Sequence, residues 1–406
     1  MREVEVIGAG MVRFGKYNGK HLPWKSPEDL GREACKAALK HAGVNHKKIE
    51  AAYFGETYAG MPQVAQRVLD YLGISGISMY NHENACATSL ASFRHAYFDV
   101  ANGMYDLVIA AGVEKMGLVP AKKEGKGGGG MGGAGGLLGG GPIVMPEGMM
   151  FLQDVGMLMP AFFALLGRRH MEEFGTTREQ FAKISVKNHR HGALNPYSQY
   201  QKEVTLEEVL NSRMVCDPIT LLQCTPTSDG AAAVILASSE VARQYTTKRV
   251  RVAGSVIYGG EYKCSKGDFT SIGTCKKAAN MIYEASGISP EDLDVAEQHD
   301  CFTPHELVTY EDLGICPKGE GGRLVDEGVT GLGGKGPVFN PSGGLQAKGH
   351  PIAATGVAQI VELVWQLRGE CGPRQVEGAK VGIAHNGGGI GPGLEPGLLS
   401  LTILAK

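Results

Sequence analysis

The chain has 406 residues, of which 43% are hydrophobic and 20% are charged, and its formal net charge is -2. This length is large for a single hydrophobic core, so we expect two domains or one duplicated architecture. The near-neutral charge, without basic runs or zinc-finger spacing, argues against nucleic-acid binding.

The N-terminal residues 1–15, MREVEVIGAGMVRFG, predict a strand rather than a signal peptide, because no charged stretch precedes a long apolar one. The most apolar window, residues 149–167, is interrupted by glutamine, aspartate, glycine and proline. It therefore predicts a segment that covers the core or a ligand, and no membrane span. The nine cysteines form no C-x-x-C pair, which favours reduced thiols and a cytoplasmic location over disulfides or structural zinc.

Two stretches of the chain share one pattern, which indicates an internal repeat. Residues 38–58 and 282–302 each read as a helix end, a C-cap glycine (Gly43 and Gly287), a short link and a strand. Each of these strands ends in polar residues. Alternation of helices and strands in both halves predicts a duplicated α/β fold with mixed sheets.

Cys86 lies in the run NHENACATSLASFRHAYFDVANG, residues 81–103, just before apolar positions with helical spacing. This pattern places the thiol at or just before a helix N-terminus. Unpaired N–H groups and the helix dipole there stabilise a thiolate or the oxyanion of a bound carbonyl. Taken alone, the pattern leaves a second interpretation open, because cysteine is also a common buried small residue.

The middle of the chain differs in composition from the two halves. Its glycine-rich part, residues 125–141, lacks P-loop spacing and predicts a surface loop. Helical patterns follow, as over residues 165–192. The predicted division of the chain is an N-terminal half at 1–117 completed by 215–245, an inserted loop and helical subdomain at 118–214 covering the active site, and a C-terminal half at 246–406.

The C-terminal half adds three polar clusters at predicted turns. His350 lies in a Gly/Pro turn before a helix and off its apolar face, so it is a candidate general base or hydrogen-bond donor. Two other polar clusters follow strand-like runs. They are His299 and Asp300 with Cys301, and His385 with Asn386. Gly387–Gly389 would allow a ligand to approach the backbone closely. Each cluster alone is a weak signal, but cysteines and histidines at several loop ends of a duplicated fold favour an active site.

The motifs NACATS (84–89), GHPIAATG (349–356) and HNGGG (385–389) together resemble the thiolase family, over essentially the whole chain. Thiolases usually carry Asn-Glu-Ala-Phe where this chain has HDCF (299–302), and Cys-x-Gly-Gly-Gly where it has HNGGG. Both departures resemble the branch of the sterol-carrier-protein-type and archaeal acetoacetyl-CoA thiolases. The resemblance implies a layered α-β-α-β-α fold with mixed sheets.

The resemblance also implies a reaction, the Claisen condensation of two acetyl-CoA molecules to acetoacetyl-CoA by a ping-pong mechanism, or its reverse. Coenzyme A is then a substrate, and no metal or bound cofactor is expected. The implied roles are Cys86 as acyl nucleophile, His350 as base and oxyanion donor, Cys301 as acid/base, His299 as holder of an oxyanion-site water, His385 beside the acid/base in the position of the displaced thiol, and the backbone near Gly388 as oxyanion donor.

Partners are expected from the resemblance alone. They are acyl-CoA substrates, further copies of the chain in a homodimer or homotetramer, a zinc-ribbon and OB-fold protein, and the hydroxymethylglutaryl-CoA synthase of mevalonate synthesis. Two other classes of function stay open at this point. A condensing enzyme or aldolase on the same fold would show a different third residue or lack the nucleophile, and an acyl- or lipid-binding protein would show no turnover. The joint presence of Cys86, Cys301 and His350 favours a thiolase.

Overall fold

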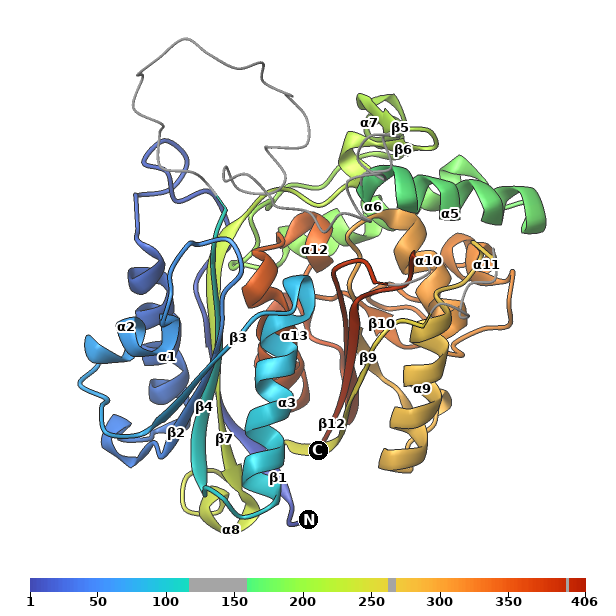
Figure 1. Cartoon of the computed structure of the whole chain (residues 1–406). Helices are drawn as coiled ribbons and strands as arrows, with labels where there is room; N and C mark the ends of the chain where they lie inside the picture. Colours follow the sequence, from blue (N-terminus) through green and yellow to red (C-terminus); the bar gives the residue numbers. More distant parts are fainter. Residues whose placement is uncertain (117–158, 262–267, 392–393) are drawn as a thin grey trace.

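The computed structural model describes residues 1–116, 159–261, 268–391 and 394–406 (Figure 1). The predicted glycine-rich loop at 125–141 lies outside these residues. The helices are α1 Pro27–Ala42, α2 Val64–Asp70, α3 Thr88–Ala101, α5 Met159–Phe174, α6 Arg178–Ala193, α7 Leu206–Asn211, α8 Ser239–Ala242, α9 Gly273–Ser286, α10 Thr303–Asp312, α11 Gly321–Asp326, α12 Gly344–Ala347 and α13 Thr355–Arg368. The strands are β1 Val4–Met11, β2 Ala51–Gly55, β3 Ser78–His82, β4 Leu107–Lys115, β5 Met214–Cys216, β6 Ile219–Thr220, β7 Asp229–Ser238, β8 Arg251–Tyr258, β9 Val295–Glu297, β10 Val338–Phe339, β11 Val381–Gly388 and β12 Leu398–Ala405.

The sheet topology confirms the duplication. The strand order is β3-β2-β4-β7-β1 in the first half and β10-β9-β11-β12-β8 in the second, so the two orders match strand for strand. The directions match as well. In each half the strands at the outer end run parallel and the two nearest the middle of the molecule are antiparallel. The halves join where β1 meets β8, through the pair Glu5 and Arg251.

Helices separate and cover the sheets, giving the expected α-β-α-β-α layers (Figure 1). Helices α3 and α13 pack against each other in the central layer, while α1 and α2 cover the first half and α9 and α10 cover the second. The helical positions predicted to be apolar, such as Phe93 on α3 and Ile360 on α13, are fully buried in this central core. Helix α13 is buried almost all round because it lies between two sheets.

The helix ends follow from the sequence. Helices α1 and α9 both end at the predicted C-cap glycines, and Gly43 and Gly287 have φ values of 67° and 68°. Only glycine adopts this left-handed conformation without a steric cost. The same cap in both halves therefore turns the chain in the same direction toward β2 and β9.

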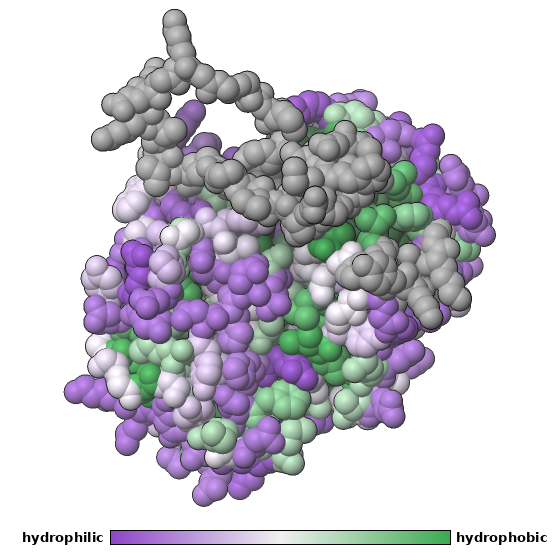
Figure 2. All heavy atoms as spheres, viewed as in Figure 1, coloured by the Kyte–Doolittle hydropathy of each residue, from purple (hydrophilic) through white to green (hydrophobic). Residues whose placement is uncertain are grey.

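The helices predicted over 165–192 are present as α5 and α6, and they pack on the C-terminal half against α10. Within the described residues, no helix combines the length and the apolar composition that a membrane span requires. Figure 2 shows hydrophilic side chains over most of one face, with hydrophobic side chains gathered near its centre.

Candidate active site

Cys86 lies in a short 3₁₀ turn, Ala85–Ala87, that leads from β3 into α3, as the sequence predicts. Ala85 has a φ of 47°, in the left-handed region that costs a non-glycine residue free energy. The Thr88 hydroxyl stabilises the turn because it accepts the N–H of Asn84 and donates to the Ala85 carbonyl. The backbone therefore fixes the position of the thiol.

His350 lies before the 3₁₀ turn Ile352–Ala354 that leads into α13, and it contacts the Cys86 thiol, with 3.3 Å between Nε2 and Sγ. Its Nδ1 is 2.7 Å from the Thr355 hydroxyl, which itself donates to the Pro351 carbonyl. The hydroxyl must then accept, so Nδ1 carries the ring proton and Nε2 is a free acceptor. The imidazole is thus oriented to take the proton of the Cys86 thiol.

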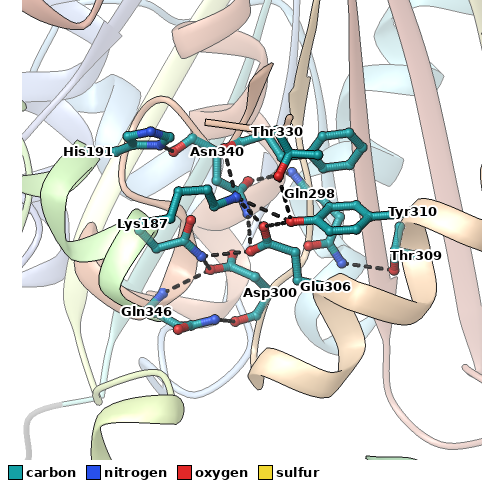
Figure 3. Close-up of polar contacts among 12 residues, drawn as sticks. Lys187, His191, Gln298, Asp300, Glu306, Thr309, Tyr310, Thr330, Asn340 and Gln346 are labelled. Atoms are coloured by element: carbon teal, nitrogen blue, oxygen red, sulfur yellow. Dashed lines mark hydrogen bonds and ion pairs between the residues drawn. The ribbon is translucent and has the colours of Figure 1, made fainter. Parts of the chain in front are cut away.

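Cys301 lies between β9 and α10, and its Sγ is 3.4 Å from Nδ1 of His305. Its neighbour Asp300 anchors this loop. Oδ1 of Asp300 accepts the N–H of Leu345 at 2.6 Å, and Oδ2 accepts the side-chain amide of Asn188 at 2.9 Å. Figure 3 shows Asp300 within a larger group of polar side chains that includes Glu306 and Lys187.

His299 lies beside both thiol–imidazole contacts. Its ring centroid is 5.1 Å from that of His350 and 5.6 Å from that of His305. Its Nδ1 accepts the N–H of Gly387 at 3.1 Å, so the ring proton is on Nε2. His299 can therefore donate a hydrogen bond from Nε2.

These side chains share one cavity. Four of the predicted site residues line it: Cys86, His299, Cys301 and His350. His385 is not among the described lining residues. It lies behind the wall, where Nδ1 accepts the N–H of His299 at 3.4 Å and Nε2 contacts the thiol of Cys275 at 3.4 Å.

The backbone next to Gly388 provides a donor to the Cys86 thiol. The N–H groups of Cys86 and of Gly389, one residue after the predicted position, are directed at that thiol. Gly388 itself packs against the turn around Cys86, since a Cβ there would lie 2.1 Å from the Asn84 carbonyl oxygen. The tight approach of β11 to residues 84–87 explains why this position is a glycine.

Burial keeps the site neutral at rest. It raises the pKa of the Cys86 thiol to about 12, with a smaller contribution from Glu114, and it raises the pKa of Cys301 as well. Burial also holds the pKa of His350 well below its ordinary value and lowers the pKa of His299 to about 4. The thiols are therefore protonated and the imidazoles are neutral bases near pH 7.

The same side chains include a possible donor set for a metal ion. Sγ of Cys86 and one ring nitrogen each of His299 and His350 lie within 4.8 Å of one another. Thiolate and imidazole ligands suit zinc. A metal ion bound there would, however, occupy the sulfur and nitrogen atoms that form the Cys86–His350 contact.

Two residues of the site were missed from the sequence. Thr355 orients His350 from the first turn of α13, and His305 contacts Cys301 from the first turn of α10. Thr355 lies within the motif GHPIAATG, five residues after His350, whereas His305 lies beyond the motif HDCF, four residues after Cys301. Their roles depend on side-chain directions at a helix start, and spacing alone did not single them out.

The comparisons with known proteins agree with this geometry. The family described as "Thiolase, N-terminal domain" matches residues 4–240, and "Thiolase C-terminal domain-like" matches residues 261–393. The chain therefore belongs to the thiolase family.

Particular relatives differ in what their names state. An acetyl-CoA acetyltransferase of Methanothermobacter thermautotrophicus is 41% identical, over 96% of this chain and 97% of the relative. Sterol carrier protein 2 of Bos taurus is 41% identical, over 94% of this chain and 69% of the relative. The solved Ltp2-ChsH2(DUF35) aldolase superposes with a TM-score of 0.80 at 25% identity, over 99% of this chain and 97% of that one.

Proposed function

We propose that this protein is a thiolase that makes and cleaves 3-ketoacyl-CoA thioesters, with acetoacetyl-CoA and two molecules of acetyl-CoA as the substrate pair. The observation that carries the proposal is the 3.3 Å contact of Cys86 with His350 in a cavity that Cys301 also lines. The name of the archaeal acetyltransferase relative supports the choice of acetyl-CoA.

In the first half-reaction, the Cys86 sulfur attacks the thioester carbonyl of acetyl-CoA while its proton passes to Nε2 of His350. Coenzyme A leaves as the thiol, and an acetyl group remains on Cys86. The N–H groups of Cys86 and Gly389, which face the sulfur, would stabilise the oxyanion. The reaction needs side chains of this chain and coenzyme A as a substrate, with no further cofactor.

In the second half-reaction, Cys301 removes a proton from the α carbon of a second acetyl-CoA. The resulting enolate attacks the acetyl group on Cys86. His299 carries its ring proton on Nε2 and can donate a hydrogen bond to the enolate oxygen. His350 has passed the Cys86 proton to the departing coenzyme A, so its Nε2 is again an acceptor. The new carbon–carbon bond replaces the bond between Cys86 and the acetyl group, and the Cys86 sulfur leaves and regains a proton.

The apolar wall of the cavity favours a second candidate, a thiolase for a longer or bulkier acyl group. Burial of apolar acyl surface against such a wall would stabilise the bound substrate. The apolar lining side chains are Met116, Met159, Phe162, Phe163, Ile272, Phe302, Ile352, Ile390 and Leu394. A series of 3-ketoacyl-CoA chain lengths decides between the two substrates.

The test is thiolysis of acetoacetyl-CoA by coenzyme A, with Cys86→Ala and Cys301→Ala beside the wild type. Loss of turnover in both variants supports a two-cysteine thiolase. An aldolase on this fold would retain carbon–carbon cleavage without Cys86, and a lipid-binding protein would bind acyl-CoA without turnover. No thiolysis by the wild type at any chain length would overturn the proposal. The homo-oligomer and the partner proteins stay predictions.

A further inference from the structure

We propose that His305 is the proton partner of Cys301, so that the cavity contains two thiol–imidazole pairs in place of one. The proposal rests on the proposed function, in which Cys301 moves the α proton. Sγ of Cys301 lies 3.4 Å from Nδ1 of His305, nearly the same separation as the 3.3 Å between Cys86 and His350. Both His305 and Cys301 line the cavity.

The His305 ring is held in one orientation by its neighbours. It stacks on Phe163, with 4.9 Å between ring centroids and an interplanar angle of 28°. The rings of His299 and His385 contact it at 5.6 Å and 5.7 Å. These contacts fix the ring plane, and in this plane Nδ1 faces the Cys301 sulfur at 3.4 Å.

A purely structural role does not account for His305. Its Nε2 is buried and has no hydrogen-bond partner among the described residues, so the Cys301 thiol is the one polar contact of the ring that the structure shows there. An unpartnered buried nitrogen is unfavourable, and a phenyl ring would stack on Phe163 without that cost. An imidazole at this position therefore indicates that a ring nitrogen takes part in hydrogen bonding or proton transfer.

The described lining of the cavity lacks charged side chains, which indicates the role of this nitrogen. Among the described lining residues there is no aspartate, glutamate, lysine or arginine. An enolate formed in this apolar space requires a nearby positive charge or strong donors, because few polar groups replace water. His305, in contact with the base that forms the enolate, is suitably placed to supply that charge.

The proton balance is simple. The proton of the Cys301 thiol moves to Nδ1 of His305 and leaves a thiolate beside an imidazolium. The thiolate then takes one proton from the α carbon of the acyl-CoA, and the electron pair of that C–H bond forms the enolate. The products are an enolate, a Cys301 thiol and a His305 imidazolium, so total charge is unchanged.

The resting pair is neutral. Burial is the main cause that holds the pKa of His305 well below its ordinary value, and the nearby His299 and His385 lower it further. Burial likewise raises the pKa of Cys301. Charge separation is therefore confined to turnover, when the enolate forms next to the pair.

The experiment separates the two half-reactions in His305→Asn and His305→Phe. Asparagine keeps a hydrogen-bond acceptor near the position of Nδ1 but has no basic nitrogen, and phenylalanine keeps the stacking on Phe163. The first readout is the rate at which acetyl-CoA acetylates Cys86, followed by mass spectrometry. The second is exchange of the α hydrogens of acetyl-CoA with deuterated water. We expect exchange to fall about 100-fold in both variants, as for loss of general acid–base assistance, and acetylation to change by less than about threefold.

Several outcomes would overturn the proposal. Exchange at the wild-type rate in either variant would show that His305 does not accept the proton of the Cys301 thiol. This holds for asparagine as well, because it can position the thiol but has no basic nitrogen. An equal fall of both half-reactions would indicate general damage to the cavity. If His305→Phe does not fold, His305→Asn alone decides. Failure of the proposed function is distinguishable, because it would appear as undiminished exchange in Cys301→Ala or as no thiolysis by the wild type.

Discussion

Cys86 and Cys301 face the same cavity, yet the chain positions their thiols by different means. The turn around Cys86 is held by backbone geometry, with Ala85 in the left-handed region and Gly388 packed closely against residues 84–87. The loop that carries Cys301 is held by side chains, because Asp300 accepts hydrogen bonds from Leu345 and Asn188. Both thiols thus depend on segments far away in the sequence, but the Cys86 turn is fixed by close backbone packing and the Cys301 loop by hydrogen bonds to a carboxylate.

The two histidine partners differ in a related way. His350 has a third member, Thr355, which fixes the ring proton on Nδ1 and leaves Nε2 to accept from Cys86. His305 has no such member, since its Nε2 is unpartnered within the described residues. The first pair is therefore held in one tautomer with Nε2 facing Cys86, whereas no hydrogen bond to Nε2 among the described residues fixes the tautomer of the second.

The largest expected effect comes from the base of the first pair. His350→Asn removes the acceptor of the Cys86 proton. We expect Cys86 acetylation to slow about 100- to 10,000-fold, the range for loss of a general base. Exchange of α hydrogens should slow less than acetylation. The same two readouts proposed for His305 are measured here. A decrease of less than about tenfold in the acetylation rate would contradict the role of His350.

Asp300→Ala tests the network that holds Cys301. The change leaves the N–H of Leu345 and one N–H of the Asn188 side-chain amide buried without their acceptor, while Glu306 still accepts the other N–H of that amide. We expect the free energy of unfolding to fall by about 2–5 kcal/mol, since each unsatisfied buried group costs about 1–3 kcal/mol. Urea unfolding measures this loss.

The matched control for this change is Asp300→Asn, which keeps a carbonyl oxygen for Leu345 and should lose less stability. The half-reactions distinguish position from stability. In folded Asp300→Ala protein, α-hydrogen exchange should fall more than acetylation of Cys86. Equal falls would mean that the network supports the whole cavity and not the Cys301 loop in particular.

Gly388→Ala is the corresponding change on the Cys86 side. Its Cβ would lie 2.1 Å from the Asn84 carbonyl oxygen and 2.6 Å from the Ala87 nitrogen, so the turn must shift. We expect a loss of about 1–3 kcal/mol in the free energy of unfolding, as for overpacked cores. Acetylation of Cys86 should fall more than α-hydrogen exchange, the reverse of the Asp300 result. A variant with wild-type acetylation would show that the turn is not fixed by this packing.

Thr355→Val tests the third member of the first pair with little change in shape. It removes the oxygen that accepts from Nδ1 of His350, which frees the ring to adopt the other tautomer. Loss of one hydrogen bond costs about 1–1.5 kcal/mol net, which corresponds to a fall of about 5- to 12-fold in the acetylation rate. Thr355→Ser keeps the hydroxyl and should retain most of the rate. Equal rates in the two variants would exclude a positioning role for Thr355.

The sequence predicted the architecture because the repeat leaves local marks, such as the C-cap glycines Gly43 and Gly287. It also predicted that Cys86 and His350 lie just before the central helices, which is where the structure has them. The sequence did not predict the hydrogen bonds of Asp300, because Asn188 comes from α6, more than a hundred residues away along the chain. His305 was missed for another reason, since its role depends on a ring orientation that Phe163 on α5 determines.

The smallest expected effect is the response of the first pair to acid, and it tests whether that pair is neutral. Burial holds the pKa of His350 well below its ordinary value and raises the pKa of Cys86 to about 12. As pH falls from 8 to 5.5, His350 therefore stays a neutral base and Cys86 stays a thiol. We expect the acetylation rate to change less than about twofold, whereas a base with a pKa of about 6.5 would lose about tenfold at pH 5.5.

This measurement requires a rapid pH jump, because the free energy of unfolding also decreases as pH falls through this range. The pKa values of His299 and His385 are lowered by burial to about 4 and about 3, so the unfolded chain binds protons first. Stability from these neutral histidines is complete above a pH of about 6.5 and is lost as pH falls toward the folded-state values. Acetylation measured before unfolding isolates the chemistry. A fall centred near pH 6.5 in that early phase would show that His350 titrates as an ordinary imidazole, and the two pairs would then differ in charge as well as in support.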